Sequence, residues 1–302
     1  MSDLEQRNNP YNVTQASRIY FLPNLMTAGN LFCGFGAVIK CIQARLIIDG
    51  GEYATLHPDV SWSALFTHAV LLILMAVVFD SLDGRLARMG GRTSLFGAEF
   101  DSLADVVSFG VAPALMMFFL ILAPREDYQW FRELGWIIAF IYLLCGAVRL
   151  ARFNVITNPL LHRAESESNK DFLGLPIPAA AGTVATLVLL LLNMSANARE
   201  LHQLTLALPM ILILVSFLMV STVRYPSFKQ INWETKTRFR TFIALFIALV
   251  VIFWKLREVA FFFIFLAYIA YGLFAHYQRG VRHVQMRALR RKVVKMKQQS
   301  SE

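Results

Sequence analysis

The stretch that decides the fold is DSLDGRLARMGGRTSLFGAEFDSLAD, residues 80–105. The segments on either side of it, residues 62–79 and 106–123, contain no Asp, Glu, Lys or Arg. Each flanking segment is long enough to cross most of a hydrocarbon core of ~30 Å as a helix. An Asp at membrane depth costs roughly 2.5–3.5 kcal/mol on insertion scales, so acidic residues there usually mark a function. We therefore expect two membrane helices that meet at an acidic functional site.

The composition indicates an integral membrane protein. The chain has 302 residues, of which 57% are hydrophobic and only 16% are charged. A soluble domain carries about 25% charged residues, so the soluble class is excluded. We predict an all-α fold, a polytopic membrane bundle of about eight transmembrane helices. The predicted spans are residues 19–40, 62–84, 97–123, 134–154, 174–194, 203–223, 239–254 and 259–278. Residues 239–254 have the shortest uncharged core and would also suit a re-entrant segment.

The positive charges predict the orientation. Most of the 29 Lys and Arg residues fall in alternate connections between the predicted spans, including the tail 279–302. Cytoplasmic loops carry an excess of Lys and Arg, so both termini and the acidic segment are expected on the cytoplasmic side. The tail would either bind anionic headgroups or simply anchor the orientation. The polar N-terminal residues predict no signal peptide. The three cysteines, at unrelated spacings, predict neither a disulfide nor a metal framework.

The spacing of four aspartates predicts a metal site. Asp80 and Asp83 are three residues apart, and Asp101 and Asp105 are four apart, so each pair shares one helix face. The Gly90–Gly91 pair suits a reversal that brings the two faces together. Four carboxylates in a low-dielectric site need a cation. Ligands that are all oxygen favour Mg²⁺ or Mn²⁺, and two such ions form a clamp for displacement at phosphorus.

Small and basic residues accompany the aspartates. Gly84, Ala87 and Gly97 would leave room for a bulky ligand such as a nucleotide diphosphate, and Arg88 and Ser94 would bind a phosphate. Each small residue alone would also suit close helix packing. A cation- or proton-coupled transporter is the alternative function class. Transporter sites lie near the bilayer midplane, whereas these acids lie at one end of two helices, which favours an enzyme.

The same stretch resembles the CDP-alcohol phosphatidyltransferase family, whose signature is D-x₂-D-G-x₂-A-R-x₈-G-x₃-D-x₃-D. The matching residues are Asp80, Asp83, Gly84, Ala87, Arg88, Gly97, Asp101 and Asp105. The resemblance implies a polytopic enzyme with a six-helix core that displaces CMP from a CDP-linked lipid with an alcohol. It implies that all four aspartates bind two metal ions and that Asp105 also acts as the catalytic base.

The resemblance also implies where CDP-diacylglycerol binds. The residues expected to contact it are Asn24, Thr27, Asn30, Gly84, Ala87, Arg88, Ser94 and Gly97. The first three come from PNLMTAGN, residues 23–30, which is similar to the nucleotide-proximal segment of the family. Polar residues within a first span would alternatively serve helix–helix contacts.

Three further stretches resemble the phosphatidylserine synthase branch of this family. They are NLMTAGNLFCG (24–34), CGAVRLARFNV (145–155) and FLGLPIPAAA (172–181). The branch implies CDP-diacylglycerol and L-serine as substrates. Glycerol 3-phosphate, inositol and choline stay open as alternative acceptors.

The acceptor pocket is expected on the fourth and fifth helices. Arg149 and Arg152, beside Asn154, would bind the carboxylate of serine, because Arg offers a paired fork for such a group. Alternatively, the two arginines would be anchors that snorkel to the headgroups. Pro176 and Pro178 would break or kink the fifth helix and free backbone groups to line a pocket.

The resemblance also implies the membrane and the oligomeric state of the protein. We expect a homodimer in a bacterial inner membrane, surrounded by membrane lipids, with no nucleic acid partner. The expected divisions are a cytoplasmic segment 1–18, a catalytic membrane core 19–224, additional membrane helices 225–278 and the basic tail 279–302.

Overall fold

The computed structural model describes residues 21–89, 95–122, 129–157, 172–194, 201–225 and 262–278. The predicted span 239–254 and the basic tail lie outside the described residues, and so does Ser94. Everything below refers to the described part of the chain.

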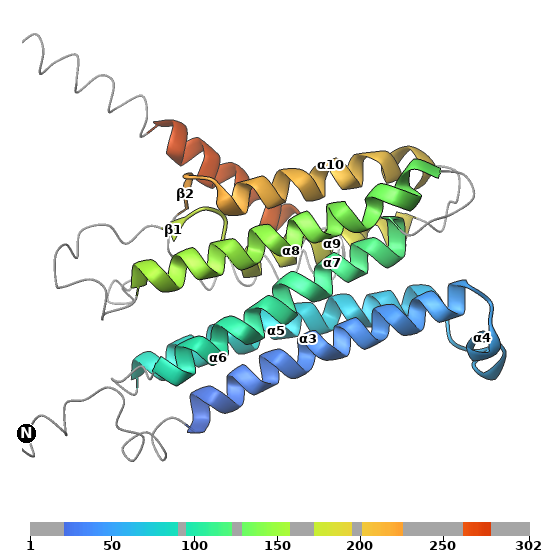
Figure 1. Cartoon of the computed structure of the whole chain (residues 1–302), viewed down its shortest axis with the longest axis horizontal. Coiled ribbons are helices and arrows are strands. Elements are labelled where there is room, and N and C mark those ends of the chain that lie inside the picture. Colours follow the sequence, from blue (N-terminus) through green and yellow to red (C-terminus); the bar gives the residue numbers. More distant parts are fainter. Residues whose placement is uncertain are drawn as a thin grey trace, which may run out of the picture.

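The fold is a bundle of helices that run side by side along one axis (Figure 1). In chain order the elements are α3 (Phe21–Ile48), α4 (Glu52–Leu56), α5 (Trp62–Met89), α6 (Leu95–Asp105), the π-helix η1 (Val106–Val111), α7 (Ala112–Met117), the π-helix η2 (Phe118–Leu122), α8 (Gln129–Thr157), β1 (Phe172–Leu173), α9 (Ile177–Met194), α10 (Leu201–Val220) and β2 (Arg224–Tyr225). A further helix spans Phe262–Gln278. The predicted helical fold is confirmed in this form, with one two-stranded pairing beside it.

Four described helices are long and apolar enough to cross a membrane. They cover Phe21–Ile48, Trp62–Leu86, Phe96–Leu120 and Leu134–Ile156. Shorter apolar helices cover Ile177–Leu192, Leu208–Val220 and Phe262–Gln278. Large apolar side chains such as Phe32 and Phe35 are exposed on the outside of the bundle, as expected for a surface that contacts lipid. The chain is therefore an integral membrane protein.

The first helix is longer than its predicted span. The sequence predicts an end near residue 40, but α3 continues to Ile48 and ends before Gly50, whose φ is +71°. No Gly or Pro interrupts residues 37–48, and Arg45 forms an ion pair of 2.9 Å with Asp49 at the helix end. The basic residues that limited the prediction lie on a helix that projects past its apolar core.

The expected break in the fifth helix is wrong. Helix α9 begins at Ile177, so Pro176 precedes it and Pro178 occupies its first turn. Proline is tolerated in the first turn because the N–H groups there have no partner within the helix. The carbonyl of Pro176 accepts a hydrogen bond of 3.0 Å from the Ala180 N–H. The two prolines therefore start the helix rather than kink it.

The third span changes its helical type three times. It is α-helical through Asp105, becomes the π-helix η1 and later, after α7, the π-helix η2. Short π-helical segments within α-helices frequently occur at functional sites. The first change follows directly on Asp105, the last predicted site residue of this span.

Small residues bring α3 close to η1. A Cβ atom at Gly34 would overlap both the side chain and the Cα of Ser108. Alanines such as Ala37 and Ala76 are fully buried within the same core, as is typical where membrane helices pack closely. This packing holds the N-terminal half of α3 against the helices that carry the aspartates.

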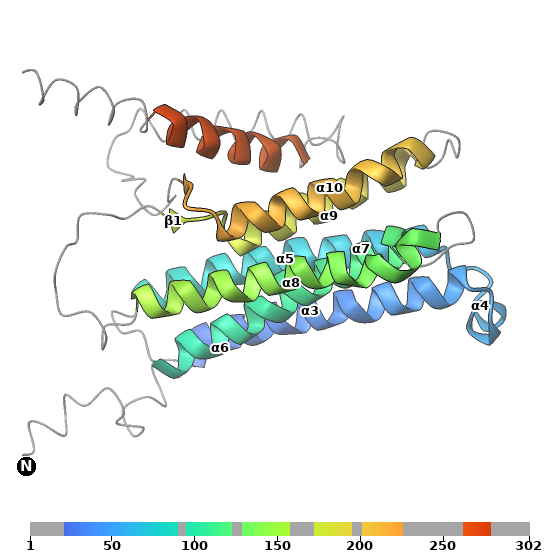
Figure 2. The ribbon, with the colours of Figure 1, turned by 45° about the horizontal axis from the view of Figure 1, so that its top comes forward.

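The strand pair lies at one end of the bundle, and the last described helix packs along its outside. Phe172 of β1 pairs with Tyr225 of β2, at the end of the bundle where α6 also begins (Figure 1). The helix Phe262–Gln278, drawn in red, lies along the outside next to α10 in Figure 2. A Cβ atom at Gly182 of α9 would overlap the ring of Phe265, which shows how closely this helix packs.

Candidate active site

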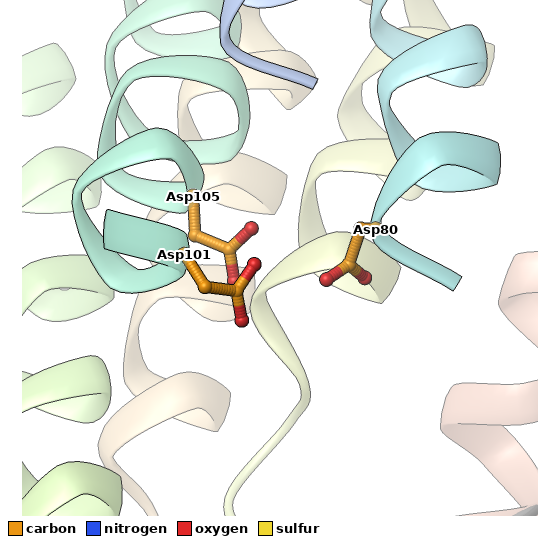
Figure 3. A group of neighbouring side chains, drawn as sticks. All are labelled: Asp80, Asp101 and Asp105. Carbon is orange, nitrogen blue, oxygen red and sulfur yellow. The ribbon is translucent and has the colours of Figure 1, made fainter. Parts of the chain in front are cut away.

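Three carboxylates face one another between α5 and α6. Asp80 lies on α5, and Asp101 and Asp105 lie one turn apart on α6 (Figure 3). One carboxylate oxygen from each residue lies within 4.8 Å of the others. Asp105 is buried, whereas Asp80 and Asp101 are half-buried. We call these three residues the aspartate cluster.

The fourth aspartate, Asp83, joins the cluster to α3. It is buried, and its Oδ2 accepts a hydrogen bond of 3.0 Å from the Thr27 hydroxyl. Its carboxyl group also interacts electrostatically with that of Asp101. The helix face that Asp80 and Asp83 share therefore points toward both α3 and α6, as their spacing predicts.

Asn30 of α3 bonds directly to the aspartate cluster. Its Nδ2 donates a hydrogen bond of 3.1 Å to Oδ1 of Asp105. Its backbone carbonyl accepts a hydrogen bond of 2.9 Å from the Ser108 hydroxyl on η1. Asn30 is thus fixed through its backbone while its amide orients the carboxylate of Asp105.

The donor set fits a divalent metal ion. Oδ1 of Asp101 is buried and has no hydrogen-bond partner among the described residues, so the cluster keeps an oxygen for a cation. Buried carboxylates at this separation repel one another unless a cation or protons neutralise them. The three ligands that the cluster offers are all carboxylate oxygens, which suit Mg²⁺ or Mn²⁺ rather than zinc or copper.

A buried arginine lies beside the cluster. Arg149 of α8 is 7% exposed and interacts electrostatically with both Asp105 and Asp80. Its Nε has no hydrogen-bond partner among the described residues. Arg152 is half-buried on the same helix. An anchor that snorkels would keep its charged head at the surface, so the burial of Arg149 argues against that alternative for this residue.

Asn154, a predicted acceptor-binding residue, forms hydrogen bonds to α6. Its Nδ2 donates a hydrogen bond of 2.9 Å to the hydroxyl of Ser102, and its Oδ1 accepts one of 3.1 Å from it. This bond ties the end of α8 to the turn between Asp101 and Asp105. Neither Ser102 nor Ser108 belongs to a local motif, and their partners are far away along the chain, so the sequence alone does not single them out.

Apart from Ser94, the other predicted contacts of CDP-diacylglycerol lie on the same three helices. Asn24 is on α3, Gly84 on α5 and Gly97 on α6, and all three are half-buried. Ala87 and Arg88 belong to the last turn of α5, but their side chains are not among the described ones. The described helices therefore carry the predicted residues at one end of the bundle.

Residues 20–221 match the family described as CDP-alcohol phosphatidyltransferase. The chain belongs to this family. The match runs from the start of α3 to the end of α10, so it includes every element that carries the aspartates and Arg149. The resemblance seen in the aspartate motif is thereby confirmed over most of the chain.

Three relatives from distant organisms all have serine in their names. The CDP-diacylglycerol--serine O-phosphatidyltransferase of Helicobacter pylori is 36% identical over 84% of this chain and 90% of its own. The archaetidylserine synthase of Methanothermobacter thermautotrophicus is 36% identical over 68% of this chain and 69% of its own. The CDP-diacylglycerol--serine O-phosphatidyltransferase of Saccharomyces cerevisiae is 37% identical over 54% of this chain and 51% of its own.

Proposed function

We propose that this protein transfers the phosphatidyl group of CDP-diacylglycerol to the hydroxyl group of L-serine, giving phosphatidylserine and CMP. The observation that carries the proposal is the aspartate cluster, with buried Arg149 beside it, at one end of a membrane helix bundle. The cluster offers ligands for cations that would neutralise a diphosphate, and Arg149 offers a cation for the carboxylate of an amino acid. The length of the match to the Helicobacter pylori enzyme supports serine as the acceptor.

Four carboxylates would hold the metal ions. We assign Asp80, Asp83, Asp101 and Asp105 to two divalent cations, Mg²⁺ or Mn²⁺, because the site offers oxygen ligands and includes the unpartnered Oδ1 of Asp101. When bound, such ions supply positive charge that polarises the phosphoryl oxygens and stabilises the departing CMP.

Asp105 would act as the general base. Its Oδ1 accepts the Asn30 amide, which leaves Oδ2 to accept the proton of the serine hydroxyl. The serine oxygen then bonds to the lipid-linked phosphorus as the bond from that phosphorus to CMP breaks. CMP leaves with the bonding electron pair, and Asp105 holds the proton. The chain supplies no nucleophile in this direct displacement.

The lipid nucleotide would bind along α3, α5 and α6. We assign its contacts to Asn24, Thr27, Asn30, Gly84, Ala87, Arg88, Ser94 and Gly97. Thr27 and Asn30 hold aspartates at the same time, through the hydrogen bonds to Asp83 and Asp105. Thr27 and Asn30 would therefore each position an aspartate and also contact the lipid nucleotide.

The acceptor would bind between α8 and the aspartate cluster. We assign the serine carboxylate to Arg149 and, less directly, to Arg152. Asn154 completes this group by holding α8 against Ser102 of α6. This arrangement would bring the serine hydroxyl toward Asp105.

The membrane topology, the division of the chain and the oligomeric state are proposed from the sequence and the family. The protein would cross a bacterial inner membrane about eight times, with both termini and the active site on the cytoplasmic side. Six helices would form the catalytic core within residues 19–224, followed by additional helices to residue 278 and the cytoplasmic tail. Segment 1–18 would precede the core in the cytoplasm, and the active form would be a homodimer.

An acceptor panel tests the proposed function. The purified full chain is incubated with CDP-diacylglycerol and Mg²⁺ or Mn²⁺, and CMP release is measured with one alcohol at a time. L-Serine should support CMP release with phosphatidylserine as the lipid product, whereas glycerol 3-phosphate, myo-inositol and choline should not. Faster CMP release with any of those three would assign the chain to another acceptor within the same family.

A further inference from the structure

Two tyrosines from outside the matched family region extend the site beyond Arg149. Tyr225 lies on β2 and Tyr268 on the helix Phe262–Gln278, whereas the family match ends at residue 221. Their ring centroids are 5.6 Å apart. Neither residue belongs to any motif in the sequence, and the reaction as derived above does not use them.

Tyr225 is completely buried with an unsatisfied hydroxyl. Its side chain is 0% exposed, and its Oη has no hydrogen-bond partner among the described residues. Burial raises the pKa of Tyr225 to about 12, so the hydroxyl keeps its proton and can donate it in a hydrogen bond. A buried polar group without a partner is unfavourable, and it is usually explained by a functional role or a ligand. Tyr225 therefore offers a hydrogen-bond donor that the described fold does not use.

Close backbone contacts at two glycines surround Tyr225. Its strand pairs with β1. Gly174, directly after β1, adopts a φ of +79°, and its N–H donates a hydrogen bond of 2.8 Å to the Val223 carbonyl. A Cβ atom at Gly174 would overlap the Met219 carbonyl oxygen, and one at Gly272 would overlap the ring of Tyr225. Two glycines thus permit the close contacts that seat Tyr225 between the strand pair and the last described helix.

Tyr268 connects this tyrosine to the active site. It interacts electrostatically with both Tyr225 and Arg149. Arg149 in turn interacts with Asp105 and Asp80, and its Nε is another buried donor that has no hydrogen-bond partner among the described residues. Tyr268 therefore interacts both with a cation and with a phenol that have unused donors among the described residues, and the cation interacts with the proposed general base.

We propose that Arg149 and Tyr225 donate hydrogen bonds to the carboxylate of the amino-acid acceptor, and that Tyr268 forms the wall of this pocket. The inference rests on the proposed function and deepens it. A cation with a neutral donor suits a singly charged carboxylate, because each donor finds an acceptor and one charge is balanced. An uncharged polyol would offer these two donors no carboxylate oxygen, so the pocket would select against it. The chain after residue 221 would thus supply acceptor selectivity to a catalytic centre made by the family core.

The test compares L-serine with L-serinamide, which keeps the hydroxyl and the amine but replaces the carboxylate by a neutral amide. Steady-state CMP release by the purified full chain gives kcat/KM for both acceptors. The quotient, kcat/KM for serine divided by kcat/KM for serinamide, measures recognition of the carboxylate. Tyr225→Phe should lower this quotient about three- to tenfold, since it removes one hydrogen bond. Arg149→Gln should lower it roughly ten- to hundredfold, because that hydrogen bond also carries charge. Tyr268→Phe should also lower it, because it removes the hydroxyl group that interacts with Arg149. The KM for CDP-diacylglycerol should stay unchanged in all three.

Tyr271→Phe is the matched control, since Tyr271 lies on the same helix as Tyr268 but is exposed. Its quotient should equal that of the wild type. The inference is overturned if Tyr225→Phe and Tyr268→Phe both keep the wild-type quotient. This includes the case in which both variants lower kcat/KM equally for serine and serinamide, because an equal loss leaves the quotient unchanged and indicates a structural role. Should Tyr225→Phe not fold, Tyr268→Phe and Arg149→Gln still decide the question. In contrast, a wild type that releases no CMP with serine contradicts the proposed function itself.

Discussion

The side-chain amide of Asn30 lies 3.1 Å from Oδ1 of Asp105 and donates a hydrogen bond to it across the contact between α3 and α6. The same residue is held by the Ser108 hydroxyl through its backbone carbonyl. Two helices and the first π-helical turn therefore meet at the carboxylate proposed as the general base. Its orientation depends on residues outside the aspartate motif.

Asn30→Ala tests this dependence. Removing the donor frees Asp105 to rotate and removes a hydrogen bond to a charged group, so kcat should fall roughly ten- to hundredfold. Cys33→Ala is the control, because Cys33 is buried one turn further along α3 in the apolar core. Its kcat should stay within about twofold of wild type, given that the substitution removes only a thiol from the core. An Asn30→Ala enzyme with normal kcat would show that Asp105 needs no orientation by α3.

The metal assignment predicts a dependence on divalent cations. Chelation should abolish turnover, and Mg²⁺ or Mn²⁺ should restore it, because the ligands are carboxylate oxygens. Asp80→Ala and Asp101→Ala should each lose binding of Mn²⁺, measured directly by calorimetry on the purified protein. Glu99→Ala is the matched control, since Glu99 is an exposed acid on α6 next to these ligands. Equal Mn²⁺ affinity in Asp101→Ala and Glu99→Ala would contradict the site.

The bond between Ser102 and Asn154 predicts an effect on stability. Asn154→Ala should lower the free energy of unfolding by about 1 kcal/mol, because it removes the hydrogen bonds that link α8 to α6. Ser102→Ala should have a similar effect, and the double variant should lose little more than either alone. Ser81→Ala serves as the control, since its exposed hydroxyl donates a hydrogen bond to the Val77 carbonyl of its own helix. Strictly additive losses measured by thermal unfolding in detergent would show that the two residues do not act as a pair.

The sequence predicted the part of the site that depends on local spacing. The three- and four-residue intervals place Asp80, Asp83, Asp101 and Asp105 on facing helix sides, and the structure brings all four to the contact between α5 and α6. Hydropathy located the long spans equally well, because lipid imposes a length on an apolar helix. The end of α3 was placed too early, since a helix continues past its apolar core where no residue stops it.

The contacts between distant segments were beyond sequence reasoning. No sequence pattern links Ser102 to Asn154. Tyr225 meets Tyr268 only because the strand pair and the last described helix pack together. Pro176 and Pro178 gave a false signal, because proline either breaks a helix or begins one, depending on where the helix starts. Only the tertiary structure decides between these two outcomes.

The proposed topology predicts opposite labelling of the two ends of the bundle. Helix α4 lies at the end away from β1 and α6 (Figure 1). A cysteine in place of exposed Glu52, in a chain lacking its three natural cysteines, should react with an impermeant thiol reagent in intact cells. Cysteines in place of Gly91, Ala164 or Ser301 should react only after the membrane is made permeable. Labelling at Gly91 from outside would reverse the orientation and move the active site away from the cytoplasm.

The most direct test of the central claim is the serine-dependent rate of CMP release in Asp105→Asn compared with wild type. The wild type should convert CDP-diacylglycerol and L-serine to phosphatidylserine and CMP. Asp105→Asn should still bind CDP-diacylglycerol but release CMP about 10²–10⁴-fold more slowly, because an amide does not accept the hydroxyl proton as a general base. A near-normal rate in Asp105→Asn would show that the proton goes elsewhere and would contradict the assignment of Asp105 as the base.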